Sequence, residues 1–249
     1  MAPTIVFDAL GTLLSFDGPA NQLFKLFPSL GPDGFSRYFP FVLRDYMASS
    51  YSGDYRPLSH FFRHCLPRFL ITQGLPVDDE AKENIESFMR FFARGMEPVE
   101  GAQEALELLI SKGWLVSIVT NGGRSTVENA LKNGSILQHF DSGKAILSCE
   151  EIGAAKTDPR VYQAIKIHLK KTYQLEENEP FWFVAGHAWD CQAARNCGFL
   201  TAFCEAYEEP IWNDAWSPPQ VLATEDAIGV GLLGAVQAAI AVEESKTIK

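Results

Sequence analysis

A lone carboxylate, Asp8, follows the first apolar run of the chain, Thr4 to Phe7, and Gly11 and Thr12 come shortly after it. At the carboxyl end of a buried strand, such a side chain faces the crevice in which open α/β sheets bind ligands. Gly11 permits a tight turn whose backbone N–H groups can cradle an anion. The same residues are also typical of a strand-to-loop turn with a capping aspartate. The stretch therefore predicts either a plain turn or a nucleophilic carboxylate.

Lys156 stands just before a predicted helix start. Asp158 as N-cap and Pro159 as the first helical residue explain that start by themselves. Lys156 is then either an ordinary surface lysine or a cation that points into the crevice. In the second case its ammonium would keep Asp8 ionised and offset the charge of an anionic substrate.

Two more apolar runs end in polar residues. Thr120 and Asn121 follow one of them, where they either orient a neighbouring carboxylate or ligand or belong to an Asn-Gly-Gly turn. Asp190 lies just past another run, Phe181 to Ala185. It either caps the helix that follows, pairs with Lys156, or activates a water molecule.

Short apolar runs and amphipathic segments alternate along most of the chain, and they are the elements that would position these side chains. The apolar runs cover residues 4–7, 114–119, 145–147, 181–185 and 200–203, and helical periodicity is clear at 100–111 and 125–132. Strands that alternate with helices predict a Rossmann-like α/β core, a parallel sheet with helices on both faces. A final apolar helix is expected at about 227–242.

The region from about 21 to 95 breaks this alternation, because it holds no good strand. Its aromatic-rich amphipathic segments are 21–27, 39–47, 58–71 and 79–92. An insertion directly after the first strand of an open parallel sheet would lie over the ligand crevice as a lid. We therefore expect an α/β core made of residues 1–15 and 97–249, with an inserted all-helical cap at 16–96.

The composition disfavours several function classes. The net charge of −10 argues against binding to nucleic acid or to an anionic membrane surface, whereas local cations can still hold a small anionic substrate. The five cysteines are odd in number and form no Cys-x-x-Cys pair, which favours a reducing, cytoplasmic setting over a disulfide framework or a zinc site. No stretch of about 20 apolar residues predicts a membrane span.

The order of these motifs along essentially the whole chain resembles the haloacid dehalogenase-like hydrolase superfamily. Its members share a nucleophilic Asp on the first strand, a Ser or Thr on the second, a Lys and a terminal acidic motif. In the phosphatase branch the first motif is Asp-x-Asp-Gly-Thr, and its second Asp is the general acid and base toward the leaving group. Leu10 stands at that position here and can neither donate nor accept a proton. A magnesium-dependent phosphatase, with Asp190 among its metal ligands, is therefore the alternative function.

Within the superfamily, the sequence is most similar to the L-2-haloacid dehalogenases. Three motifs carry this resemblance: Asp-Ala-x-Gly-Thr at 8–12, Lys-x-Asp-Pro-x-x-Tyr at 156–162 and Ala-Trp-Asp at 188–190. The resemblance implies a hydrolase that removes halide from a short 2-haloalkanoic acid through an aspartyl ester on Asp8, and a homodimer is common in this branch. The chemistry needs no metal or other cofactor, because halide leaves as a stable anion and an acid at position 10 would serve no purpose.

The resemblance also implies a role for each candidate site residue around the nucleophile, Asp8. Those expected to orient it and to hold the substrate carboxylate are Thr12, Thr120, Lys156 and Tyr162. Those expected to bind the substrate or cradle the leaving halide are Leu10, Arg44, Asn121 and Trp189. Arg44 is chosen for its place early in the cap, where Arg37, Arg56 and Arg63 are the alternatives.

The last motif departs from the family. Where Ser-x-Asn-Ala-Trp-Asp is common and fixes the hydrolytic water, this chain has Ala185, Gly186 and His187 before Ala-Trp-Asp, so two water-positioning groups are changed. His187 is either the base for that water, which its ordinary pKa of about 6.5 suits, or an imidazole that supports the site. The change also motivates a third hypothesis, a non-catalytic or repurposed member that binds a metabolite or a protein partner.

Overall fold

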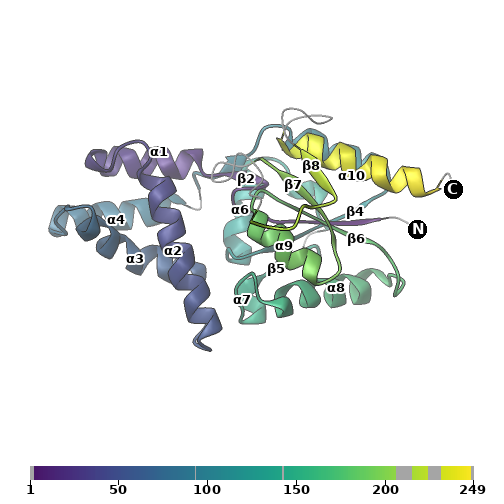
Figure 1. Ribbon diagram of the computed structural model, residues 1–249. Coiled ribbons are helices and arrows are strands. Elements are labelled where there is room, and N and C mark those ends of the chain that lie inside the picture. Colours follow the sequence, from purple (N-terminus) through teal and green to yellow (C-terminus); the bar gives the residue numbers. More distant parts are fainter. Residues whose placement is uncertain (1–2, 93, 142, 206–214, 224–230, 248–249) are drawn as a thin grey trace.

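The computed structural model describes residues 3–92, 94–141, 143–205, 215–223 and 231–247 (Figure 1). In these ranges the chain forms a six-stranded parallel sheet with the strand order β5-β4-β1-β6-β7-β8. The strands are β1 (Thr4–Phe7), β4 (Leu115–Thr120), β5 (Ile146–Ser148), β6 (Phe181–Ala185), β7 (Leu200–Cys204) and β8 (Val221–Ala223). The predicted α/β core is confirmed, and β1 and β6 begin and end where the sequence predicts. The short edge strand β8 was not expected.

Helices cover both faces of the sheet, so its central strand β1 is fully buried. Val6 packs in one cluster with residues of α8 and α9, whereas Ile5 and Phe7 point the other way, toward α5, α6 and α10. Figure 1 shows α10 above the sheet and α8 below it. The alternating side chains of a single strand thus contribute to two hydrophobic layers. The covering helices are α5 (Ala102–Ser111), α6 (Arg124–Asn133), α8 (Pro159–Tyr173), α9 (Ala188–Asn196) and α10 (Gly231–Thr247).

Four helices follow β1 and lie together beyond one end of the sheet, at the left of Figure 1. Aromatic rings fill the space between them, and the ring centroids of Phe16, Phe35 and Phe39 are 4.6 to 5.9 Å apart. The helical region predicted after the first strand is therefore confirmed. Its helices are α1 (Asp17–Leu26), α2 (Gly34–Tyr51), α3 (Leu58–Thr72) and α4 (Asp79–Phe92).

The helix α2 is longer than the predicted segment 39–47. Pro40 lacks an N–H group, which favours a helix boundary there. The helix nevertheless starts at Gly34 and runs through the proline. Phe35 and Tyr38, which precede Pro40, are buried in the aromatic core, and this packing holds the first turns of the helix in place.

The chain enters and leaves the helical region through a short antiparallel pair, β2 (Leu14–Ser15) and β3 (Glu97–Pro98). The two crossings therefore lie side by side. Because this pair stands at both boundaries, we propose that residues 1–15 and 97–249 form the core and that 16–96 form the cap.

The C-terminal helix α10 begins at Gly231, and residues 227–230 of the predicted helix lie outside the described part of the chain. The helix α7 (Cys149–Ile152) and two 3-10 helices, Pro28–Leu30 and Leu137–His139, are also present. Within the described ranges, no helix combines the length and the hydropathy needed to cross a membrane.

Candidate active site

Asp8 lies at the carboxyl end of β1 and is 5% exposed. Its Oδ1 accepts a hydrogen bond from Lys156 Nζ at 2.7 Å, and its Oδ2 accepts one from Thr12 Oγ1 at 2.7 Å. The backbone N–H of Gly186 donates to the same Thr12 oxygen at 2.9 Å. The hydroxyl proton of Thr12 is therefore directed at Asp8. Both Asp8 oxygens act as acceptors, which is the role of an ionised carboxylate.

Lys156 is completely buried and bridges two carboxylates, because its Nζ also donates to Asp190 Oδ2 at 2.8 Å. Asp190 comes from the first turn of α9, and its Oδ1 accepts a hydrogen bond from the Tyr162 hydroxyl of α8. The structure thus brings three residues that are distant in the chain, Lys156, Tyr162 and Asp190, into one buried cluster with Asp8. With both oxygens engaged, Asp190 is better placed to hold Lys156 than to activate water.

Burial and charge act in opposite directions within this cluster. Burial alone lowers the pKa of Lys156, but Asp190 and Asp8 outweigh it and hold that pKa above its ordinary value. Burial raises the pKa of Asp190, and the Lys156 ammonium opposes the rise. Burial, with Asp190 beside it, also raises the pKa of Tyr162, so the phenol stays protonated and donates. At neutral pH the lysine is therefore a fixed positive charge beside Asp8.

Asn121 and Thr120 lie at the end of β4, the strand next to β1. Asn121 Oδ1 accepts a hydrogen bond from the Lys156 backbone N–H at 3.0 Å, which ties the lysine loop to β4. Thr120 Oγ1 accepts one from Gly122 N–H at 3.0 Å. In the described part of the chain, no hydrogen bond joins Thr120 to Asp8. The Thr120 hydroxyl instead stabilises the turn that presents Asn121.

His187 is the N-cap residue of α9 and is 2% exposed. Its Nδ1 lies 3.8 Å from Asp8 Oδ2, and its ring centroid lies 5.1 Å from that of Trp189. A Cβ added to Gly11 would come within 3.1 Å of His187 Cε1, and Gly11 has a φ of +80°. Glycine at this position therefore leaves room for the imidazole beside the nucleophile.

Leu10 and Arg44 are not joined to Asp8 by any contact that the structure records in its described ranges. Leu10 is buried against the turn after β4, where a Cβ at Gly122 would lie 3.1 Å from Leu10 Cδ1. The Arg44 side chain is 60% exposed, and its Nε donates to Asp45 Oδ1 at 2.9 Å. A role for either residue in substrate binding stays a prediction.

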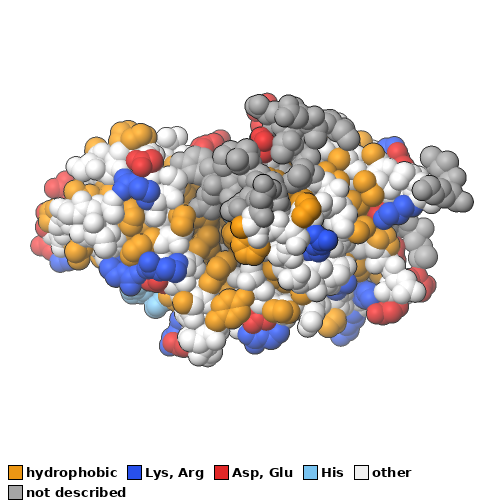
Figure 2. Space-filling model, in the orientation of Figure 1, with side chains coloured by type: hydrophobic (Ala, Val, Ile, Leu, Met, Phe, Trp, Pro, Cys, Tyr) orange, Lys and Arg blue, Asp and Glu red, His pale blue; other side chains and the backbone are white. Residues whose placement is uncertain are grey.

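The alternative cap arginines are also engaged within the helical region. Arg37, Arg56 and Arg63 each form an ion pair with an acidic residue of that region. Figure 2 shows Lys and Arg side chains on the outer surface of this part of the molecule. The structure therefore places these cations in solvent, away from the buried Lys156.

Three polar side chains of α2 form hydrogen bonds to the α/β core, and none of them was predicted from the sequence. Tyr46 and Ser50 are buried and stand four residues apart on the helix. Two polar residues within a buried helical stripe were the available signal. The hydrogen bonds join Tyr46 to Asn121 at 3.2 Å, Ser50 to the Ala155 N–H at 2.9 Å and Tyr51 to Thr157 at 2.6 Å. Ala155 and Thr157 flank Lys156 in the chain, so α2 is attached close to the lysine that holds Asp8.

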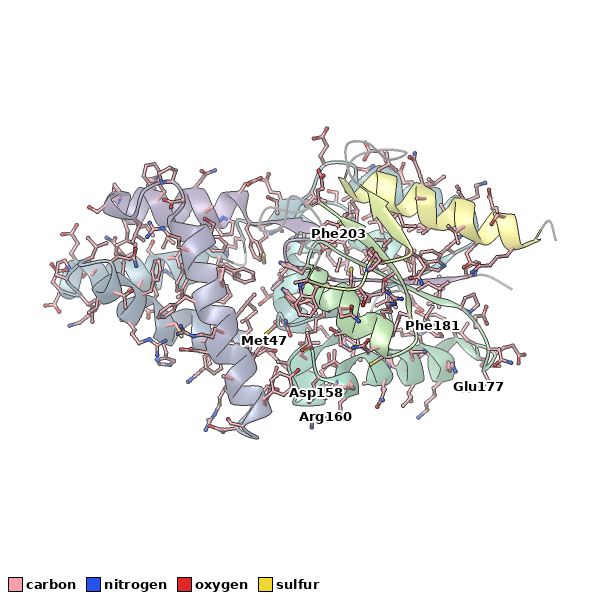
Figure 3. The ribbon with its side chains drawn as sticks, in the orientation of Figure 1. Met47, Asp158, Arg160, Glu177, Phe181 and Phe203 are labelled. Carbon is pink, nitrogen blue, oxygen red and sulfur yellow. The ribbon has the colours of Figure 1, made fainter. Side chains whose placement is uncertain are left out.

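A cavity of about 600 Å³ lies between α2, the start of α8 and α9, which contributes residues from Trp189 to Asn196. The predicted site residue Arg44 is part of its lining. Its lining is mostly apolar and includes Leu43, Met47, Pro159 and Trp189. Figure 3 shows Met47 on the side of α2 that faces the core. Two of the cavity's lining residues are neighbours of the Asp8 cluster: Thr157 follows Lys156 in the chain, and the Trp189 ring packs on His187.

Comparison with protein families matches residues 2–198 to the haloacid dehalogenase-like hydrolases. The match covers most of the chain. The chain belongs to this family. It is therefore a hydrolase, as the resemblance of its motifs implies.

Curated relatives in the haloacid dehalogenase-like family are similar over most of their length. The chain is 28% identical over 198 residues to an (S)-2-haloacid dehalogenase of Pseudomonas putida, covering 78% of this chain and 81% of the relative. It is 29% identical to an (S)-2-haloacid dehalogenase of Pseudomonas fluorescens, covering 78% of this chain and 80% of the relative.

Solved structures of the family share the fold. The L-2-haloacid dehalogenase from Xanthobacter autotrophicus, with chloropropionic acid covalently bound, matches with a TM-score of 0.78 at 18% identity. The match covers 96% of this chain and 99% of that one. The L-2-haloacid dehalogenase RSc1362 matches with the same TM-score of 0.78 at 21% identity, covering 96% of this chain and 99% of that one.

Proposed function

We propose that the protein hydrolyses short 2-haloalkanoic acids to 2-hydroxy acids and halide through an ester on Asp8. The observation that carries the proposal is the Asp8 carboxylate, which Lys156 and Thr12 hold while the apolar Leu10 stands two residues later. A carboxylate that displaces halide from carbon needs no proton donor for its leaving group. The (S)-2-haloacid dehalogenase activity of the relatives supports the same assignment.

In the first step, an Asp8 oxygen attacks the carbon that bears the halogen. The ester C–O bond forms as the carbon–halogen bond breaks, and the halide leaves with the electron pair. Lys156 supplies the positive charge beside two negative groups, the Asp8 carboxylate and that of the incoming substrate. We assign contact with the departing halide to Asn121 and Trp189, which follow β4 and β6, the two strands that flank β1.

In the second step, water attacks the carbonyl carbon of the Asp8 ester. The bond from that carbon to the substrate oxygen breaks, and the 2-hydroxy acid leaves. The water must lose one proton and the departing alkoxide must gain one, while the second proton of the water is released to solvent as Asp8 returns to the carboxylate. We assign both transfers to His187 Nδ1, which lies 3.8 Å from Asp8 Oδ2, because both oxygens of Asp190 are already engaged.

The purified protein is expected to release chloride from (S)-2-chloropropionate and to form (R)-lactate. The first displacement inverts the carbon, and the second step attacks the Asp8 carbonyl and leaves that carbon unchanged. Ion chromatography measures the chloride, and chiral chromatography measures the lactate. The proposed function would be contradicted if neither (S)-2-chloropropionate nor (S)-2-bromopropionate released halide. Formation of (S)-lactate would contradict the route through an ester on Asp8.

The same assay with EDTA separates this proposal from the magnesium-dependent phosphatase. Leu10 supplies no acid for an alcohol leaving group. Among the described residues, no three His, Cys, Asp or Glu side chains are grouped to hold a metal ion. Halide release is expected to persist in EDTA. Magnesium-dependent hydrolysis of p-nitrophenyl phosphate, without halide release, would favour the phosphatase.

Changing His187 to alanine is expected to block the second step and spare the first. The variant should release about one halide per enzyme and then turn over roughly a hundredfold or more slowly, the usual contribution of a general base. Rapid-quench halide measurement gives the burst, and intact-mass spectrometry detects the retained ester. His64→Ala, which removes an exposed imidazole of α3, is the control. Steady turnover without ester in His187→Ala would rule out this role.

We also propose a small anionic substrate and a cytoplasmic location. Lys156 is the buried cation that a substrate carboxylate would approach. The five thiols, all free, fit a reducing compartment. A homodimer stays a prediction.

A further inference from the structure

Tyr46 connects the helical region to the candidate site. Its side chain is fully buried, and its hydroxyl donates to Asn121 Oδ1 at 3.2 Å. The donor comes from α2, and the acceptor stands at the end of β4, 75 residues later. Burial raises the pKa of Tyr46, and the neighbouring Cys149 and Tyr55 add to the rise. The phenol is therefore a permanently neutral donor at this contact.

The orientation of the Asn121 amide is fixed by its two donors. The backbone N–H of Lys156 can only donate, so the Asn121 atom 3.0 Å away from it must be the carbonyl oxygen. The Tyr46 hydroxyl donates to the same oxygen. The Asn121 Nδ2 must then point away from both donors. In the ranges that the structure describes, no hydrogen bond to another residue engages this NH₂ group, and Asn121 is 5% exposed.

We propose that Tyr46 is a positioning residue that sets the leaving-group preference of the enzyme, by holding Asn121 so that its Nδ2 donates to the departing halide. The inference rests on the proposed function, because it needs a halide leaving from the Asp8 reaction. Two donors on one side of the amide leave its NH₂ group with a defined direction. Removing the Tyr46 hydroxyl leaves only the Lys156 N–H, and the amide plane is then free to rotate about that bond.

The expected signature is a change in the ratio of two substrates. Chloride concentrates its developing charge on a smaller atom than bromide does, and it is the poorer leaving group. An aligned N–H donor therefore stabilises the transition state more for chloride than for bromide. A change that merely loosened the fold would slow both substrates by the same factor.

The test compares Tyr46→Phe with the wild-type enzyme on (S)-2-chloropropionate and (S)-2-bromopropionate. The measured quantity is kcat/KM, which includes only the steps up to halide release. We expect it to fall about tenfold for the chloro substrate and about threefold for the bromo substrate, a range set by one lost hydrogen bond. Tyr173→Phe is the matched control, because it removes a tyrosine hydroxyl that donates to Asp141 at an exposed contact at the C-terminal end of α8. This control is expected to leave both values unchanged.

A double-mutant cycle tests whether Tyr46 acts through Asn121. In the Asn121→Ala background, Tyr46→Phe is expected to cause no further change in the chloride-to-bromide ratio. Equal losses for both substrates in Tyr46→Phe, or a full additional loss in the Asn121→Ala background, would overturn the inference while the proposed function stands. Absence of halide release by the wild-type enzyme would instead remove the proposed function and this inference with it.

Discussion

Replacing Asp8 with asparagine is expected to lower halide release from (S)-2-chloropropionate by roughly a thousandfold or more. The amide keeps the size of the carboxylate but cannot act as the nucleophile. Its oxygen can still accept from Lys156 or Thr12, which hold the two Asp8 oxygens, so the variant should fold. Ion chromatography of chloride measures the loss, and thermal unfolding checks the fold.

Asp8→Ala is the second variant, because asparagine at a reactive site can deamidate back to aspartate. It is expected to lose activity to the same extent and to regain none on storage. Asp54→Asn serves as the matched control, since that carboxylate is exposed and pairs with Arg56 within the helical region. Substantial chloride release by folded Asp8→Ala protein would show that another group attacks the substrate.

Replacing Lys156 with methionine is expected to abolish activity and to lower the free energy of unfolding by about 3–5 kcal/mol. The side chain is completely buried between Asp8 and Asp190, with Nζ distances of 2.7 and 2.8 Å. Methionine fills a similar volume but leaves two carboxyl groups facing each other without a cation. Urea unfolding measures the loss of stability.

A double variant separates the two effects of Lys156. Adding Asp190→Asn to Lys156→Met removes the unpaired buried charge, so part of the stability is expected to return. Halide release is expected to remain absent, because Asp8 still lacks its ammonium. Full recovery of activity in the double variant would contradict the role given to Lys156.

The same lysine predicts an alkaline loss of stability. Its pKa in the folded protein lies above the ordinary value of 10.5, because Asp190 and Asp8 outweigh burial. The resulting stabilisation is complete below that ordinary pKa and is lost as the pH rises through the higher folded value. Wild-type protein should therefore lose stability relative to Lys156→Met only in the strongly alkaline range.

Much of the fold was predictable because its signals are local. The apolar runs at β1 and β6 set those strands, and Asp158 with Pro159 set the start of α8. The ends of parallel strands meet at one edge of the sheet, so Asp8 and Asp190 could be expected near each other before any distance was known.

The contacts between α2 and the core were not predictable from spacing. Tyr46 and Asn121 are 75 residues apart, and their meeting depends on how the helical region sits on the sheet. The same dependence applies to Arg44, which lines the cavity with Trp189 while its Nε pairs with Asp45. Thr120 lies where expected, but its hydroxyl oxygen is used by the Gly122 N–H of its own turn.

The central claim, that Asp8 forms the ester, is tested most directly by a single turnover in ¹⁸O-labelled water with enzyme in excess over (S)-2-chloropropionate. Mass spectrometry is expected to find ¹⁸O in the peptide that contains Asp8, while the lactate carries an unlabelled oxygen from that carboxylate. Labelled lactate with an unlabelled Asp8 peptide would show that water attacks the substrate directly, and would contradict an ester on Asp8.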